Sequence, residues 1–236
     1  QGWFQQAKIT APNMAQFLDL VALGTVADLV PLEYNNRILV AQGMARIRRG
    51  LARPGILALV QQAGRQLNQL QATDMGFVLG PRLNAAGRLD DMSVGIECLL
   101  TNDNERAQQL AQQLDQLNQQ RRSIEGEMQE QAAIIVGQLQ EAETTELPPC
   151  VCLFQPDWHE GVVGIVASRI KERWHRPSLV FAQGEDGLLK GSARSIAGFH
   201  MRDALAAVDA KHPHLIERFG GHAMAAGLSI SLDHLE

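Results

Sequence analysis

The sequence has few aromatic residues and few cysteines, and both shortages narrow its possible functions. Aromatic residues make up 5% of the 236 residues, which disfavours a platform on which nucleic-acid bases stack against aromatic rings. The three cysteines, Cys98, Cys150 and Cys152, form neither an even disulfide framework nor a C-x-x-C metal or redox motif. We therefore expect structural thiols in a reducing compartment.

Long apolar runs and several catalytic motifs are also lacking. No stretch approaches the roughly 20 apolar residues of a membrane-spanning helix, and no charged-then-apolar leader opens the sequence. We therefore expect a cytoplasmic protein without membrane contact. The sequence has no G-x-x-x-x-G-K-[ST] loop, G-x-S-x-G elbow or H-E-x-x-H motif, which argues against P-loop NTPases, α/β-hydrolases and zincins.

Positive charge is not in excess. With a net charge of −5, a nucleic-acid function requires a local basic patch, because the overall charge repels phosphates. Basic residues cluster at 46–53 and at 169–176. Taken alone, each cluster is more typical of a solvated helix face than of a DNA-binding surface.

The length and the patterning favour two domains joined by a long helix. Asn13 is a candidate N-cap, and helical apolar repeats dominate the first hundred residues. Residues 102–142 contain no proline, and their apolar residues recur at heptad-like spacing. They predict a connecting helix of about 60 Å; an intermolecular coiled coil is the alternative.

Strand and helix patterns alternate after residue 148, which indicates an α/β domain. Residues 143–149 are expected to form a turn and linker. The fold class is thus α/β, divided into residues 1–102, 103–147 and 148–236. Strands are expected at 150–155, 178–182, 188–195 and 227–232, and helices at 160–174 and 201–208.

Two stretches of the first domain carry candidate chemistry. In "LGTVADLVPL", Asp28 is either a helix-end cap or a hard metal ligand, and spacing alone favours the cap. In "GPRLNAAGRLDD", residues 80–91, Arg82, Asn84 and Arg88 lie among glycines that let backbone amides approach an anion. This stretch contacts a phosphodiester, or its arginines simply pair with Asp90 and Asp91; the residues leave both open.

Two stretches of the second domain suggest an anion site. In "HEGVVGIVASRIKERW", His159 precedes a helix whose first turn contains Gly161 and Gly164, so free amides can meet an anion, although close packing explains the glycines equally well. In "KGSARS", Ser192 and Arg194 alternate on a strand end, and both side chains therefore point the same way. Such a pair suits a terminal phosphate.

A fifth stretch, "RFGGHAMAAG" at 218–227, places Gly220 and Gly221 before His222. Two glycines indicate that the backbone turns sharply or closely approaches another group. Alone, the stretch favours a structural histidine after a tight turn.

Together and in this order, the five stretches resemble the RecJ family of single-strand-specific exonucleases in the DHH phosphoesterase superfamily. The resemblance rests on "GTVADLVPL", "GPRLNAAGRLDD", "HEGVVGIVASRIKERWHRP", "GSARS" and "FGGHAMAAG". It implies that residues 1–102 are the mostly helical later half of the DHH catalytic domain. Residues 148–236 are then the DHH-associated domain, with a mixed sheet, and the long helix bridges a cleft between the two.

The resemblance also implies an activity and residue roles. Single-stranded DNA threads between the domains and is cut from its 5′ end, with Mn²⁺ or Mg²⁺ activating water, in DNA repair and recombination. Asp28 matches a metal ligand, and the catalytic set is Asp28 with His222, which contacts substrate phosphate. A single-strand-binding protein and a helicase are possible partners. The expected nucleic-acid contacts are Arg82, Asn84, Arg88, His159, Ser192, Arg194, Gly220 and Gly221.

One departure from the family pattern matters. The family's aspartate pair and Asp-His-His triplet are missing from the sequence, whose seven histidines include no adjacent pair. We therefore expect a fragment that lacks most metal ligands, binds DNA weakly and does not turn substrate over. Two alternatives stay open: a DHH-family phosphoesterase acting on short oligonucleotides or nucleotide bisphosphates, and a non-catalytic nucleic-acid-binding module.

Overall fold

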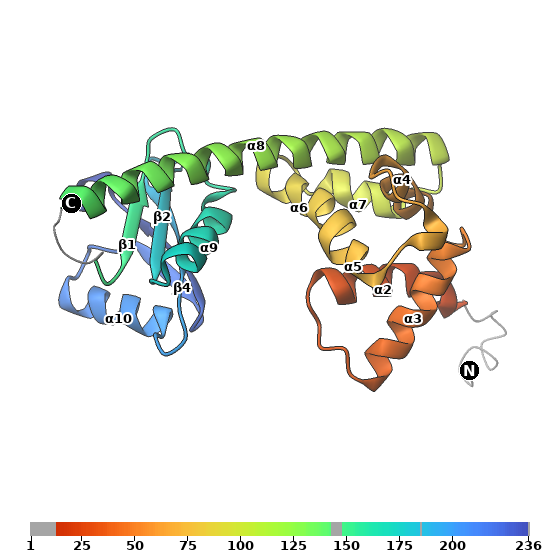
Figure 1. Ribbon diagram of the computed structural model, residues 1–236, viewed down its shortest axis with the longest axis horizontal. Coiled ribbons are helices and arrows are strands. Elements are labelled where there is room, and N and C mark those ends of the chain that lie inside the picture. Colours follow the sequence, from red (N-terminus) through yellow and green to blue (C-terminus); the bar gives the residue numbers. More distant parts are fainter. Residues whose placement is uncertain (1–12, 143–147, 185, 236) are drawn as a thin grey trace. The chain divides into compact units, whose positions relative to one another are not determined.

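The computed structural model describes residues 13–142, 148–184 and 186–235. The chain forms two compact units, Gln1–Gln119 and Gln120–Glu236. The boundary between them falls inside one long helix, α8 (Asn104–Ala142) (Figure 1). The predicted linker at 143–149 lies mostly outside the described residues. Among those residues, no helix is long and apolar enough to cross a membrane.

Every regular element in the described part of the first unit is a helix, as the apolar repeats predicted. Asn13 is a true cap, because its Oδ1 accepts a hydrogen bond from the Ala15 amide at 3.1 Å, and Pro54 occupies the first turn of its helix. Besides the start of α8, the elements are η1 (Met14–Phe17), α2 (Leu18–Ala27), α3 (Tyr34–Arg48), α4 (Pro54–Gln62), η2 (Leu67–Gln69), α5 (Ala72–Asp74), the π-helical segment η3 (Met75–Leu79), α6 (Gly80–Leu89) and α7 (Ser93–Leu100).

The core of this unit is built from side chains of several helices. Ile47 of α3 and Ile56 and Leu59 of α4 are fully buried, and each such side chain contributes about 1.5–3 kcal/mol. A buried carboxylate adds a polar link: Asp19 on α2 accepts a hydrogen bond from the Arg53 amide at 2.8 Å. This bond holds α2 to the segment just before α4.

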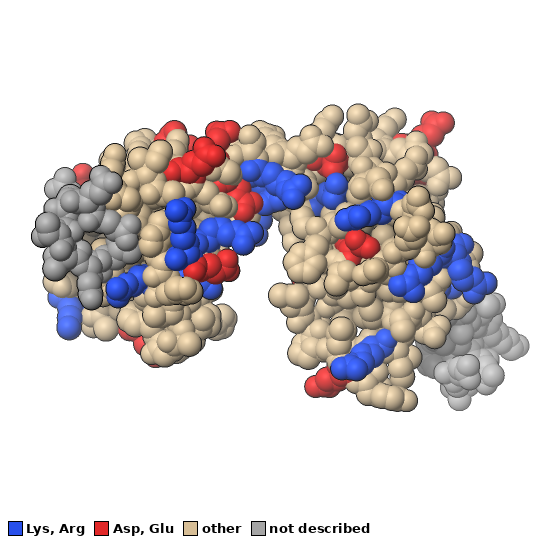
Figure 2. Space-filling model, in the orientation of Figure 1, with Lys and Arg blue, Asp and Glu red and all other residues tan. Residues whose placement is uncertain are grey.

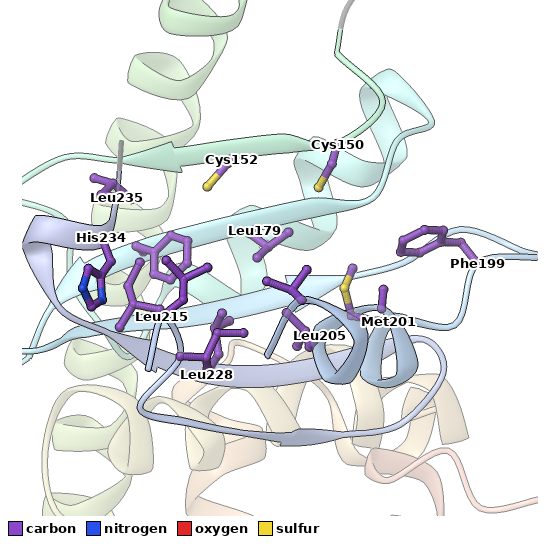
Figure 3. Close-up of a pocket in the computed structure, with 15 residues that line it drawn as sticks. Cys150, Cys152, Leu179, Phe199, Met201, Leu205, Leu215, Leu228, His234 and Leu235 are labelled. Atoms are coloured by element: carbon purple, nitrogen blue, oxygen red, sulfur yellow. The ribbon is translucent and has the colours of Figure 1, made fainter. Parts of the chain in front are cut away.

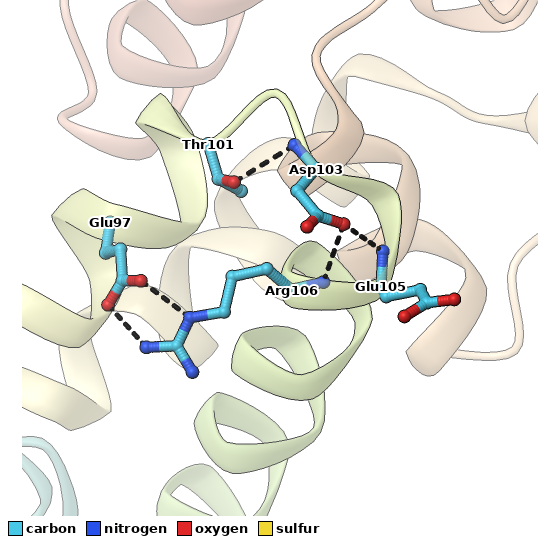
Figure 4. A network of polar contacts seen from close by, with 5 residues as sticks. All are labelled: Glu97, Thr101, Asp103, Glu105 and Arg106. Atoms are coloured by element: carbon cyan, nitrogen blue, oxygen red, sulfur yellow. Dashed lines mark hydrogen bonds and ion pairs between the residues drawn. The ribbon is translucent and has the colours of Figure 1, made fainter.

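Helix α8 begins with a network of polar contacts (Figure 4). The carboxylate of Asp103 accepts hydrogen bonds from the amides of Glu105 and Arg106, at 2.8 and 3.2 Å, which caps two of the free N–H groups at the helix start. The Arg106 guanidinium binds both carboxylate oxygens of Glu97, and this pairing lowers the pKa of Glu97.

The apolar residues that suggested a coiled-coil seam pack within this chain. Leu110 and Leu114 of α8 belong to the core of the first unit. Met128, Ala132 and Val136, further along the same helix, are also buried. Leu110, Leu114 and Met128 of the heptad-like set are therefore buried within this chain, on a helix shared by the two compact units.

The second unit contains a five-stranded mixed sheet, which confirms the predicted α/β class. The strand order is β1-β2-β3-β5-β4; β1 and β2 are parallel, and the other neighbours are antiparallel. The elements are β1 (Val151–Phe154), α9 (Val163–Trp174), β2 (Ser178–Gln183), β3 (Leu189–Arg194), α10 (Met201–Lys211), β4 (Arg218–Gly221), β5 (Ala225–Ile230) and η4 (Leu232–His234).

Helices cover both faces of this sheet (Figure 1). Leu189, Ala193 and Leu228 share a core with Met201 and Leu205 of α10. Successive side chains of a strand point to opposite faces. The alternate residues of β3 therefore face the other side, where α9 packs on β2 and β3.

An apolar pocket of about 290 Å³ lies on the α10 face (Figure 3). It is lined by residues of β1, β2, α10 and β5, including Leu179, Leu205 and Leu228. Cys150 and Cys152 also line it, two residues apart along the chain. Burial raises the pKa of the Cys150 thiol to about 11 and also raises the pKa of Cys152.

Candidate nucleic-acid interface

Ser192 and Arg194 lie side by side on β3, against the first turn of α9. The Arg194 guanidinium donates a hydrogen bond from Nη1 to Ser192 Oγ at 2.9 Å. A Cβ atom built on Gly164 of α9 would lie 2.9 Å from Arg194 Nη2 and 3.1 Å from Ser192 Oγ. The glycine thus lets the helix approach both polar side chains.

The start of α9 has the properties of an anion site. Its N-cap residue, Val162, makes no side-chain cap hydrogen bond, and the first turn carries no acidic residue. The first amides of a helix lack intrahelical acceptors and attract negative charge. Close by in sequence, His159 Nδ1 accepts a hydrogen bond from the Gly161 amide at 3.0 Å. A neutral His159 ring therefore carries its proton on Nε2, which is a donor.

Gly220 and Gly221 do not form the turn that the sequence suggested. They lie in the edge strand β4, and the connection to β5 is made by residues 222–224. Gly221 has φ +144°, and a Cβ there would lie 2.4 Å from the Ala225 carbonyl oxygen. The strand escaped prediction because a four-residue edge strand containing two glycines has no side-chain alternation to reveal it.

The strand register places the GGH stretch beside the Ser192 and Arg194 pair. Ser192 pairs with Gly227 and Gly227 with Gly220, so one row crosses three strands. Arg194 pairs with Ala225, whose carbonyl oxygen accepts a hydrogen bond from the His222 amide at 2.8 Å. The His222 side chain is exposed. The S-x-R pair at the end of β3 and His222, just after β4, therefore lie at the same end of the sheet, with β5 between the two strands.

Asp28 is the C-cap residue of α2 and is exposed. The next residue, Leu29, has φ +54°. Over the described parts of the chain, no group of three His, Cys, Asp or Glu residues is arranged to hold a metal ion. These residues thus do not fit a metal centre by themselves, and Asp28 supplies at most one carboxylate.

The stretch "GPRLNAAGR" forms helix α6, and its first glycine is explained by packing. A Cβ on Gly80 of α6 would lie 3.3 Å from the Ala27 Cβ and 3.1 Å from the Met75 carbonyl oxygen. Close packing of α6 on α2 explains this glycine. The backbone amides inside this helix donate to helical carbonyl groups, so a contact of the stretch with an anion would come from its side chains.

Arg82 is held within the first unit. Its Nε donates to Asp115 Oδ1 of α8 at 2.8 Å, and its Nη1 donates to the Val78 carbonyl oxygen at 2.7 Å. Asp115, and not the neighbouring Asp90 or Asp91, is thus the carboxylate that pairs with Arg82. Asn84 and Arg88 are exposed, and their spacing of four residues puts them on one side of α6.

The basic cluster at 169–176 is largely paired with acidic or aromatic neighbours. Arg169 lies 3.4 Å from Glu172 and 3.6 Å from Glu125, and the Arg173 guanidinium lies 4.8 Å from the ring centroid of Trp174. Figure 2 shows acidic side chains beside the basic ones on the visible face. Part of the cluster is thus paired on a solvated helix face, with Glu172 and Glu125 as its acidic partners.

Comparison with known protein families identifies the domain class of the second unit. Residues 147–236 match the DHHA1 domain family, and the mixed sheet with its flanking helices belongs to this class. The single-stranded-DNA-specific exonuclease RecJ of Dickeya dadantii (strain 3937) is 59% identical over 235 residues, which are 100% of this chain and 41% of that protein.

Solved structures agree with the sequence match. Crystal structures of RecJ from Thermus thermophilus, in complex with Mg²⁺ and with Mn²⁺, both match with a TM-score of 0.79. They are 33% and 34% identical and cover 97% of this chain, which spans 33% and 32% of theirs. The chain belongs to the RecJ family, and it spans well under half the length of these relatives.

Proposed function

We propose that this chain is part of a metal-dependent exonuclease that degrades single-stranded DNA from its 5′ end, in DNA repair and recombination. We further propose that the DHHA1 unit holds the 5′-terminal phosphate. One observation carries the proposal: Arg194 Nη2 and Ser192 Oγ lie 2.9 and 3.1 Å from the position that a Cβ on Gly164, in the first turn of α9, would occupy.

The chemistry of this pocket suits a terminal phosphate group. A guanidinium donates charge-assisted hydrogen bonds to phosphate oxygens, the serine hydroxyl adds a neutral donor, and the helix start adds a partial positive charge. His159 Nε2 and the exposed His222 extend the same donor set. Because these groups meet the backbone and not base edges, binding has little sequence preference and weakens as salt rises.

The catalytic metal belongs to the longer protein in this proposal. We propose that residues 1–102 form the later part of the catalytic domain and that Asp28 contributes one carboxylate to a Mn²⁺ or Mg²⁺ centre. Such an ion would lower the pKa of a bound water and so supply the hydrolytic nucleophile. His222 contacts the substrate phosphate, and the exposed Asn84 and Arg88 contact the DNA backbone, together with Arg82. The 236-residue chain alone binds DNA and does not turn it over.

The test compares two single-stranded oligonucleotides that differ only at the 5′ end. The affinity of the 236-residue chain for a fluorescent dT12 with a 5′-phosphate and with a 5′-hydroxyl is measured by anisotropy at low salt. We expect the phosphorylated strand to bind about tenfold more tightly, since charge-assisted hydrogen bonds are worth about 1.5–3 kcal/mol.

Variants assign this preference to the pocket. Ser192→Ala and Arg194→Ala should each reduce the preference, whereas Arg202→Ala, an exposed arginine on α10, should leave it intact. Equal affinity of the wild-type chain for the two ends would refute the phosphate pocket.

A further inference from the structure

A bare strip of sheet lies beside the Ser192 and Arg194 pair. Gly227 of β5 and Gly220 of β4 continue the row that begins at Ser192. Both glycines are exposed, and a Cβ on Gly220 would meet nothing within 4 Å. By strand alternation this strip is on the face opposite α10, so a polymer backbone can approach the sheet there without displacing a side chain.

A second row, with a cation at each end, crosses the same three strands two residues away from the row of Ser192. Lys190 of β3 pairs with Ser229 of β5, and Ser229 pairs with Arg218 of β4. Alternation puts all three on the face of Ser192 and Gly220. Lys190 precedes Ser192 by two residues in "KGSARS" and was visible in the sequence, whereas Arg218 joins it only because β4 forms.

One carboxylate lies between the two cations. Asp186, in the loop between β2 and β3, forms ion pairs through the same oxygen, Oδ2, with Lys190 Nζ at 2.5 Å and with Arg218 Nη2 at 3.6 Å. The hydrogen bond from Lys190 lowers the pKa of Asp186. An ammonium and a guanidinium that converge on one anionic oxygen have the donor arrangement that a phosphate oxygen requires.

We infer that Lys190 and Arg218 form a second phosphate site next to the Ser192 and Arg194 pocket, and that the Asp186 carboxylate occupies this site until a DNA phosphate displaces it. This inference rests on the proposed function and deepens it. The two rows are two residues apart on extended strands, about 6.4–6.8 Å. The pair of sites therefore selects a strand with at least two phosphates over a mononucleotide.

Removing the internal competitor should strengthen binding. Asp186→Asn keeps the side-chain shape and frees both cations for DNA. We expect about fivefold tighter binding of 5′-phosphorylated dT12 at low salt. We also expect a plot of the logarithm of the binding constant against the logarithm of the salt concentration to be steeper by about 0.7 to 1.4. This is the change for one or two additional phosphate contacts on a single strand. Binding of thymidine 5′-monophosphate, which has a single phosphate and cannot occupy both sites at once, should gain less than binding of dT12.

Matched variants separate this effect from general charge. Asp233→Asn makes the same charge change in η4, whose His234 lines the pocket on the α10 face, and should leave affinity within about twofold of the wild-type value. In the Asp186→Asn background, Lys190→Ala or Arg218→Ala should abolish the gain, and Arg202→Ala should not.

The outcomes distinguish this inference from the proposed function. Binding that depends on Ser192 and Arg194 but is unchanged by Asp186→Asn overturns the second site alone. An equal gain for Asp233→Asn also overturns it, because the effect is then nonspecific. Failure of both the wild-type chain and Asp186→Asn to bind dT12 overturns the second site and the proposed function together.

Discussion

Gly164 and Arg194 are so close that a single added carbon would disturb the contact between α9 and β3. The Cβ of Gly164→Ala would lie 2.9 Å from Arg194 Nη2, the end of a flexible side chain, so the guanidinium shifts while the backbone stays in place. We therefore expect the fold to persist and the affinity for 5′-phosphorylated dT12 to fall about tenfold, the loss of one charge-assisted hydrogen bond. Anisotropy measures the affinity, and a thermal melt checks the fold.

Gly126→Ala is the matched control for this substitution. Gly126 lies within α8, and a Cβ there would meet nothing within 4 Å. The change should stabilise the helix by up to about 1 kcal/mol and leave DNA affinity unaltered. A similar loss of affinity in both variants would remove the assigned role of the Gly164 contact.

The sequence predicted the elements that have a strong local pattern. The helix expected over 102–142 and the strands β1, β2, β3 and β5 all form, because helical or alternating apolar positions occur within each segment. The mutual approach of Gly164 and the Ser192 and Arg194 pair was not predictable. It depends on how α9 packs on β3, a long-range contact that no local spacing encodes.

Two expectations about glycine differ from the structure. The glycines of "GPRLNAAGR" were expected to let backbone amides approach an anion, and those of "RFGG" to let the chain turn, whereas the structure has a helix and an edge strand. Tertiary contacts decide both cases: α6 needs Gly80 to pack against Ala27, and β4 exists through its pairing with β5. In both stretches a glycine lies where two backbone segments come close together. The sequence alone does not show which segment the glycine approaches.

Gly221 and His222 are adjacent, yet their substitution should have opposite consequences. Gly221→Ala places a Cβ 2.4 Å from the Ala225 carbonyl oxygen at φ +144°, so we expect a loss of about 1–3 kcal/mol in the free energy of unfolding. His222→Ala removes an exposed side chain and keeps the hydrogen bond from the backbone amide of residue 222 to the Ala225 carbonyl oxygen, so stability should change by less than about 0.5 kcal/mol. Urea unfolding measures both.

In the full-length exonuclease, His222→Ala should nevertheless reduce turnover strongly. An unchanged rate of nucleotide release would show that His222 does not contact the reacting phosphate.

Arg82 should matter for folding as well as for DNA. Its partner Asp115 is 7% exposed, and Arg82→Ala leaves that carboxylate without its ion pair. Removing one partner of a buried pair costs about 3–5 kcal/mol, so we expect a clearly lower unfolding midpoint. Arg88→Ala, at an exposed position of the same helix, should change the midpoint little. Equal midpoints for the two variants would contradict a structural role for Arg82.

The cysteine thiols should react slowly at neutral pH although the pocket gives solvent access to Cys152. Alkylation requires the thiolate, and burial raises the pKa of Cys150 from 9.0 to about 11. The folded state holds this proton more tightly, so stability is unaffected below about pH 9 and declines as the pH rises toward 11.

Iodoacetamide labelling followed by mass spectrometry should show the rate at Cys150 still increasing at pH 10. Cys98, which is fully buried, should stay unlabelled in the folded chain. A labelling rate at Cys150 that levels off near pH 9 would contradict the raised pKa.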